Sequence, residues 1–308
     1  MVDVKEVAEN IYMIDDELLS MPKWGSVYLI NEEEKALIDT GPSSSANAVL
    51  GGIKKIGIKS EDIEYLIVTH IHLDHAGGVG VLVKDMPQAQ VVVHNRGARH
   101  LVDPSRLISS VKTVQSSEVI EGYGEVVPIE KRRVRPIYGD EVVRLSSKQI
   151  LKFIDAPGHA QHELCIYESR NNGIFVGDAA GIFVAEDEIL VPSSPPPNFD
   201  LELHIGTLER LMDLKPSLIY FAHFGVSNQA QEHLRLIKDK VRAWGDIVAQ
   251  TVKEHGLDGV EERIIAQVTT ELEPIREKEF LYEHLTKDNI ATSISGYLKY
   301  YRDKYGVE

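Results

Sequence analysis

The sequence predicts a mixed α/β (α+β) protein in which a strand-rich region precedes a helical C-terminal appendage. Short apolar runs rich in β-branched residues, with turn residues between them, recur up to about residue 225. Helical patterns with their own start and stop signals separate several of these runs. Beyond that point only helical patterns follow. We therefore expect two regions, 1–225 and 226–308, with the second packed on the first.

The first region begins with regularly spaced runs of strand character. The expected strands are 10–14, 26–31, 36–41, 65–69 and 90–94. A helix is expected over 47–56, because Gly57 follows it and glycine commonly ends helices. Asp103 followed by Pro104 indicates another helix start, with the helix running toward residue 116.

The pattern is less regular from residue 120 to 148, and then strands return before the helices take over. The expected strands are 150–155, 163–168, 173–176 and 218–222. The Ser-Ser-Pro-Pro-Pro run at 193–197 predicts a stiff loop. The expected helices are 201–214, 227–254, 261–271 and a last one capped by Asp288.

Composition narrows the class of protein. Hydrophobic residues make up 43% and charged residues 26% of the 308 residues, as in soluble globular proteins. No run approaches the ~20 apolar residues of a membrane helix. The acidic N-terminus lacks the apolar core of a signal peptide, so we expect a cytoplasmic protein. The net charge of −15 opposes binding to nucleic acid.

Cysteine usage restricts the ligands that a metal site can use. The chain has 1 cysteine, Cys165, so it forms no internal disulfide and offers no cluster of thiolates. The strand-like flanks of Cys165 indicate a small buried apolar residue. A metal site in this chain must therefore rest on histidine and carboxylate side chains.

A cluster of such residues follows the strand expected at 65–69. The chain reads Thr-His-Ile-His-Leu-Asp-His-Ala-Gly-Gly over 69–78. In an extended segment, residues two apart face the same side, so His70 and His72 can bind one ion together. A turn into a helix then brings Asp74 and His75 to a neighbouring position. Imidazole and carboxylate suit Zn²⁺, Fe²⁺ or Mn²⁺, so the segment predicts a site for divalent cations.

This run resembles the signature of the metallo-β-lactamase superfamily. Further motifs occur in the family's order: Leu-Ile-Asp-Thr-Gly at 37–41, Ala-Pro-Gly-His-Ala at 156–160, Phe-Val-Gly-Asp-Ala at 175–179 and Phe-Ala-His-Phe-Gly at 221–225. The resemblance covers about residues 1–225. It implies a four-layer αββα sandwich, with a catalytic domain over 1–225 and the C-terminal helices over 226–308 as an appendage.

The resemblance also implies two adjacent metal sites. The implied ligands are His70, His72 and His159 for one ion, Asp74, His75 and His223 for the other, and Asp178 as a bridge between them. Asp39 would accept a hydrogen bond that orients a ligand histidine. Two divalent ions are the expected cofactors, with zinc favoured and iron or manganese as alternatives. The histidines that match no ligand position are His94, His100, His162 and His204, of which His162 could line the pocket.

The implied reaction is hydrolysis of an ester, thioester, lactone or related bond in a small molecule. A hydroxide held between the metals would be the nucleophile. Asp74 and Asp39 are the expected catalytic carboxylates, with Asp74 holding or moving the proton as well as binding metal. His72 stands where the oxygen- and nitric-oxide-reducing members of the superfamily carry glutamate, which favours hydrolysis. The alternatives are an iron-dependent redox enzyme of the sulfur dioxygenase type and a phosphodiesterase or nuclease.

The expected partner is a small-molecule substrate, without nucleic acid or membrane, and a homodimer remains open. We expect the appendage and the loop at 193–199 to form two walls of the substrate pocket. The alternative is that the appendage only supports the sheet or forms a dimer contact.

Overall fold

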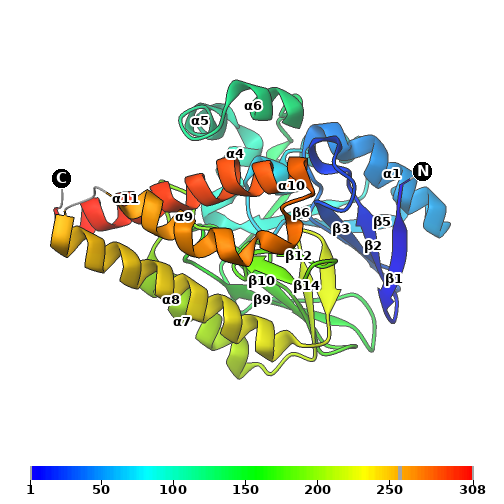
Figure 1. Cartoon of the computed structure of the whole chain (residues 1–308). Helices are drawn as coiled ribbons and strands as arrows, with labels where there is room; N and C mark the ends of the chain where they lie inside the picture. The colour runs from blue at the N-terminus through cyan, green and yellow to red at the C-terminus, as the bar shows by residue number, and fades with distance from the viewer. Residues whose placement is uncertain (1, 256–258, 307–308) are drawn as a thin grey trace. The chain divides into compact units, whose positions relative to one another are not determined.

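The computed structural model describes residues 2–255 and 259–306, drawn in Figure 1. The chain forms two compact units from interleaved segments. The first unit comprises Met1–Asp155, His162–Gly177 and Pro216–Asn228, and the second comprises Ala156–Gln161, Asp178–Lys215 and Gln229–Glu308. The boundary expected at residue 225 stays a prediction.

A seven-stranded mixed sheet forms the N-terminal half of the first unit. Its strands lie in chain order: β1 (Val4–Ala8), β2 (Ile11–Asp15), β3 (Ser26–Ile30), β4 (Lys35–Ile38), β5 (Ile63–Ile67), β6 (Gln90–His94) and β7 (Val134–Ile137). Neighbours from β1 to β4 pair antiparallel, and those from β4 to β7 pair parallel. Because β4 and β5 are parallel, their carboxyl ends share one edge of the sheet, and the chain after each strand emerges there.

A six-stranded sheet forms the rest of the first unit. Its spatial order is β15 (Gly225–Ser227), β14 (Leu218–Phe221), β11 (Gly173–Phe175), β10 (Leu164–Glu168), β9 (Ile150–Asp155) and β8 (Val142–Arg144). Only β11 and β14 pair parallel, and the other neighbours are antiparallel. Because β15 is the edge strand and pairs antiparallel with β14, the turn that joins these two strands lies at one corner of the sheet.

The first unit has two apolar cores. One core joins the two sheets and includes Tyr28 and Ile67 from the first sheet and Phe153 and Phe175 from the second. The other core covers the opposite face of the seven-stranded sheet, where helix α1 contributes Val49. The first unit is therefore a stack of helix, sheet and sheet, which accounts for three of the four predicted layers.

Several short helices complete the first unit. They are α1 (Ala46–Ile56), α2 (Leu73–Ala76), α3 (Val79–Leu82), α4 (Asn95–Val102), α5 (Ser105–Val111) and α6 (Ser117–Tyr123), with 3-10 turns at Leu18–Ser20, Ser43–Ser45, Ser60–Asp62 and Lys131–Arg133. As predicted, α1 ends at Gly57, whose φ of 88° lies in the left-handed region that glycine tolerates.

The second unit is mainly helical. It contains the hairpin of β12 (Ile182–Val184) and β13 (Ile189–Val191), and the helices α7 (Leu201–Asp213), α8 (Ala230–His255), α9 (Val260–Glu271), α10 (Glu279–Glu283), a π-helix (His284–Ile290) and α11 (Ala291–Tyr305), with a 3-10 turn at Glu273–Ile275. Trp244 of α8 and Tyr297 of α11 are fully buried and lie in its core, with ring centroids 6.1 Å apart.

The predicted α/β class and the helical C-terminal region are confirmed. Two expected helix boundaries are wrong. The helix that follows Asp103 ends at Val111 rather than near residue 116, because the β-branched residues there are poor helix formers. Asp288 does not cap the last helix, because the chain is already helical from Glu279, and its carboxylate lies 2.7 Å from His284 Nδ1 inside the π-helix.

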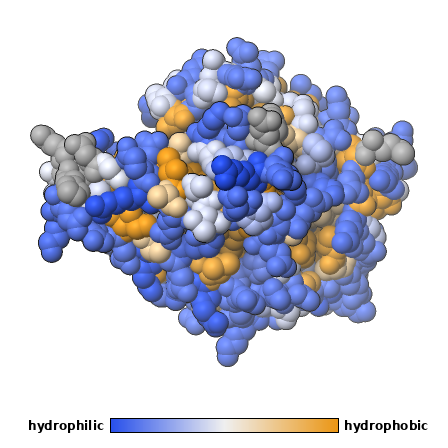
Figure 2. All heavy atoms as spheres, viewed as in Figure 1, coloured by the Kyte–Doolittle hydropathy of each residue, from blue (hydrophilic) through white to orange (hydrophobic). Residues whose placement is uncertain are grey.

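The surface reflects the high proportion of charged residues in the sequence. Among the described helices, none is both long enough and apolar enough to cross a membrane. Most of the surface seen in Figure 2 is hydrophilic, with small hydrophobic areas between. This distribution fits the high content of charged residues.

Candidate metal centre

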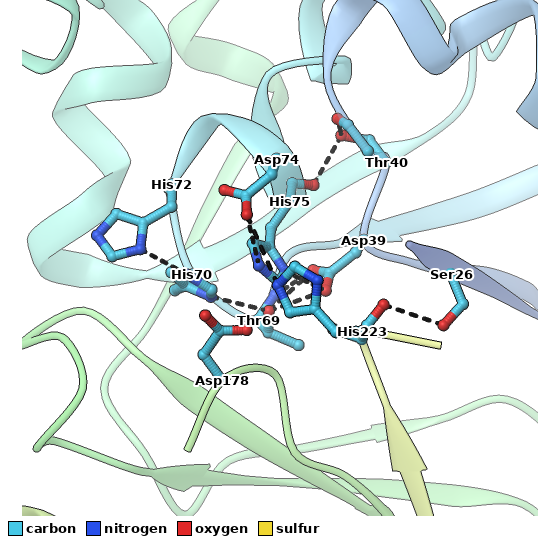
Figure 3. Close-up of polar contacts among 12 residues, drawn as sticks. Ser26, Asp39, Thr40, Thr69, His70, His72, Asp74, His75, Asp178 and His223 are labelled. Carbon is cyan, nitrogen blue, oxygen red and sulfur yellow. Dashed lines mark hydrogen bonds and ion pairs between the residues drawn. The ribbon is translucent and has the colours of Figure 1, made fainter. Parts of the chain in front are cut away.

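The first predicted ligand pair lies directly after β5. β5 ends at Ile67, and His72 is itself extended, with a φ of −62° and a ψ of 151°, just before helix α2. His70 and His72 therefore face the same side, and Nε2 of His70 lies 2.9 Å from Nδ1 of His72 (Figure 3). Two ring nitrogens directed at each other at this distance share either a proton or a cation, so they can act as ligands to one ion.

A second group of predicted ligands forms where α2 begins. Oδ2 of Asp74 lies 3.5 Å from Nε2 of His75 and 3.7 Å from Nε2 of His223, as the dashed lines in Figure 3 show. His223 follows β14, so two segments far apart in the sequence meet here. The ligand atoms of these three residues all lie within 4.8 Å of one another. The first unit alone thus supplies a three-residue group for a second cation.

Asp39 links these two groups. It follows β4 with a φ of 61°, and its buried carboxylate accepts hydrogen bonds from the backbone N–H of Thr69 at 2.7 Å and from the Thr69 hydroxyl at 2.9 Å. Oδ2 of Asp39 also lies 3.1 Å from Nδ1 of His75. The carboxylate can accept the Nδ1 proton of His75, which directs the lone pair of Nε2 toward Asp74.

Thr69 extends this orienting effect to His70. Its Oγ1 donates to Asp39 and lies 3.2 Å from Nδ1 of His70. Because the hydroxyl proton is given to Asp39, Oγ1 accepts from His70, and the lone pair of His70 is left on Nε2, which faces His72. Sequence reasoning did not single out Thr69. Its place between the strand and His70 was the available signal.

Replacement of Asp39 with asparagine is expected to lower metal affinity about 10- to 100-fold, the usual effect of removing a group that orients a ligand. The amide keeps one acceptor oxygen, which cannot serve both Thr69 and His75. The dissociation constant for Zn²⁺, measured by competition with a chromogenic chelator, checks this. The exposed Asp62, changed to asparagine, is the matched control. Equal affinity in the two variants would contradict the orienting role.

The second unit holds the other two predicted ligands. Nε2 of His159 lies 3.6 Å from Oδ2 of Asp178. Nδ1 of His159 lies 3.0 Å from the carbonyl oxygen of Ser193, and the Ser193 hydroxyl donates to Oδ2 of Asp178 at 3.0 Å. Sequence reasoning treated Ser193 as the start of a stiff loop and missed this double contact.

Helix α7 fixes the chain beside both of these ligands. Nε2 of the buried His204 donates to the carbonyl of Ala179, next to Asp178, at 2.8 Å. Thr207 Oγ1 donates to the Pro157 carbonyl at 2.6 Å. Gly158, with a φ of 145°, passes so close that a Cβ there would lie 2.3 Å from the His204 Cα atom. Glycine is therefore required immediately before His159.

Burial lowers the pKa of His204 to about 4 from its ordinary value of 6.5. Between these values the unfolded chain binds a proton that the folded protein does not, so the free energy of unfolding falls as pH drops from 6.5 to 4. We expect a loss of up to about 3 kcal/mol from this residue. Urea unfolding of the metal-free protein across this range, compared with His204→Gln, checks it, with His233→Gln on α8 as control. Identical pH slopes in the His204 variant and the wild type would rule out the effect.

The remaining histidines have other surroundings. His94 Nε2 lies 3.2 Å from Asp155 Oδ1, and burial lowers the pKa of His94. The His162 ring lies 5.5 Å from that of His72 and 6.2 Å from that of His70. Within the described residues, His94, His100, His162 and His204 belong to no group of converging ligand atoms.

The spacing of the paired atoms fits metal ligation. Two ligand nitrogens 2.0–2.1 Å from a tetrahedral zinc ion stand about 3.3 Å apart. The His70–His72, Asp74–His75 and His159–Asp178 separations of 2.9, 3.5 and 3.6 Å lie close to that value. The donor set of imidazole and carboxylate suits zinc, iron or manganese. The residues present therefore fit divalent metal ions.

Known proteins resemble this chain over most of its length. Residues 24–223 match the family model described as the metallo-beta-lactamase superfamily. A metallo-beta-lactamase fold-containing protein of Sulfurisphaera tokodaii is 27% identical over 240 residues, covering 74% of this chain and 85% of the relative. An N-acyl homoserine lactonase of a Bacillus species is 25% identical over 244 residues, covering 70% of this chain and 86% of the relative.

A solved structure extends the likeness beyond the matched region. A metallo-beta-lactamase family protein of Thermus thermophilus shares the fold with a TM-score of 0.66 at 19% identity. The match covers 97% of this chain and 95% of that protein, so it includes most of the C-terminal helices.

Proposed function

Because this chain belongs to the metallo-β-lactamase superfamily, we propose that it uses two divalent metal ions to hydrolyse an ester, thioester, lactone or related bond in a small molecule. One observation carries the proposal. The pair His70–His72 and the group around Asp74 arise from one short segment, so two ligand sets lie side by side in the first unit. Such a pair of sites is suited to two-metal hydrolysis.

We assign the ligands as the sequence predicts. The proposed ligands are His70, His72 and His159 for one ion, Asp74, His75 and His223 for the other, and Asp178 for both. Within each unit, ligand atoms of the assigned residues lie close together. They pair His70 with His72, Asp74 with His223, and His159 with Asp178. These short distances support the assignment. Zinc is the proposed metal, and iron and manganese are the alternatives to test.

When bound, the two ions would lower the pKa of water and polarise the scissile carbonyl. The chain's own residues would supply orientation and proton handling. Asp74 is the ligand best placed for the proton, because its side chain is 20% exposed whereas that of His75 is 3% exposed. We propose that the Asp74 carboxylate holds the proton released by the attacking water and passes it to the leaving group.

A lactone is the first substrate class to test. Several curated relatives are named N-acyl homoserine lactonases, at 25% identity over most of their length. We also propose a cytoplasmic location and a small-molecule substrate, and no nucleic acid partner, because the charge of −15 opposes binding to phosphate backbones.

The test is turnover by purified protein loaded separately with zinc, iron or manganese. Substrates are a set of acyl homoserine lactones, aryl esters, thioesters and aryl phosphodiesters. We expect hydrolysis of a carboxylic ester, thioester or lactone that is lost after chelation and restored by metal. Preferential phosphodiester cleavage would overturn the substrate class. Thiol-dependent oxygen uptake by the iron-loaded protein, without hydrolysis, would overturn the reaction.

A further inference from the structure

Ser193 touches two predicted metal ligands through two different atoms. Its carbonyl oxygen lies 3.0 Å from Nδ1 of His159, and its hydroxyl donates to Oδ2 of Asp178 at 3.0 Å. Ser193 is buried, with 7% of its surface exposed. These contacts lie within the second unit and involve only atoms that the structure describes.

The carbonyl contact determines which nitrogen of His159 can bind a metal. A backbone carbonyl only accepts hydrogen bonds, so Nδ1 of His159 carries the proton and the lone pair lies on Nε2. Nε2 is the atom that lies 3.6 Å from Oδ2 of Asp178. Ser193 thereby fixes the tautomer of His159 and the rotamer of Asp178 together.

Helix α11 in turn holds the segment around Ser193. The backbone N–H of Ser194 donates to Oγ of Ser293 at 3.0 Å, and Ser293 Oγ donates to the Pro192 carbonyl at 3.3 Å. Both Ser194 and Ser293 are buried. One side chain of the C-terminal helix therefore binds the chain on each side of Ser193.

The same helix approaches the segment with its backbone. A Cβ at Gly296 would lie 1.8 Å from the carbonyl oxygen of Ser194, a distance that no structure accommodates without movement. Only glycine allows this approach, because the group it meets is backbone and cannot rotate away. Ser293 and Gly296 thus hold residues 192–194 against α11, one by hydrogen bonds and the other by close backbone contact.

We propose that Ser193 is a positioning residue for the metal ligands His159 and Asp178, and that Ser293 and Gly296 of α11 hold it in place. The C-terminal helices then have a role in metal binding although they supply no predicted ligand. This inference rests on the proposed function, because it takes His159 and Asp178 as ligands. Removal of an orienting group of this kind costs about 10- to 100-fold in metal affinity.

The experiment measures metal binding rather than turnover. Zinc affinities are obtained by chelator competition, and the visible spectrum of the Co²⁺-loaded protein reports the ligand geometry. Ser193→Ala removes the hydroxyl but keeps the carbonyl, and Gly296→Ala displaces the segment without touching a ligand. We expect each to weaken one of two zinc sites about 10- to 100-fold and to alter the cobalt spectrum.

The controls separate the possible outcomes. Ser295→Ala changes an exposed serine on the same helix and should bind metal as the wild type does. If Gly296→Ala fails to fold by circular dichroism, Ser293→Ala is the second variant. It removes the hydroxyl that contacts Ser194 and Pro192 and adds no bulk. Wild-type affinity and spectrum in Ser193→Ala would overturn the inference. His159→Ala keeps the two failures apart, because wild-type zinc binding in that variant would instead overturn the proposed metal centre.

Discussion

Replacement of His72 with alanine is expected to abolish turnover and to remove metal from the site that we propose it shares with His70. The ring nitrogen of His72 that lies 2.9 Å from His70 would be lost, leaving one of the paired donors. A bound metal lowers the pKa of water from 15.7 to about 7, so loss of that ion removes most of the nucleophile at neutral pH. We expect kcat/KM to fall on the order of 10³-fold or more, about 4 kcal/mol of activation free energy.

The fold should survive this substitution. His72 precedes α2 but its side chain makes no capping hydrogen bond to the helix, so alanine removes no helix cap. Metal content by elemental analysis and kcat/KM on the best substrate are measured alongside the circular dichroism spectrum. His100→Ala is the control, because His100 matches no ligand position. Normal turnover by His72→Ala would disprove its assignment as a ligand.

The local part of the site could be predicted because short segments set its geometry. The ring nitrogens of His70 and His72 meet because the two residues stand two positions apart just before a helix. Because α2 begins at Leu73, Asp74 and His75 come round to a neighbouring position, with the His75 ring 4.1 Å from that of His70. These relations depend on sequence spacing alone. The strands on either side were equally readable, since their apolar runs are short and bounded by turns.

The supporting contacts could not be predicted in this way. Ser193 contacts His159 and Asp178 across 34 and 15 positions of sequence, and Ser293 contacts Ser194 across 99. No spacing rule relates such residues, because the packing of helices decides which loops meet. The π-helix at His284–Ile290 was missed for a related reason, since its pattern resembles that of an ordinary helix.

Replacement of Tyr297 with alanine is expected to destabilise the unit that carries His159 and Asp178. Tyr297 is fully buried, its ring lies 4.5 Å from that of Phe199, and its hydroxyl donates to the Val241 carbonyl at 2.8 Å. Truncation of a buried aromatic side chain costs about 3–5 kcal/mol, which includes the cavity that it leaves. We expect the melting temperature of the metal-free protein to fall by roughly 10 °C.

The accompanying measurement links this core to the metal centre. Tyr297 lies one turn along α11 from Ser293, so loosening of the helix should release Ser194 and then Ser193. We therefore expect Tyr297→Ala to lose zinc at a temperature where wild type retains it. A chromogenic chelator present during heating measures the zinc that is released. Tyr305→Ala, at a site 57% exposed on the same helix, should change stability by less than about 0.5 kcal/mol. If Tyr297→Ala lowers the melting temperature but keeps the wild-type zinc release profile, α11 stabilises its unit without supporting the ligands.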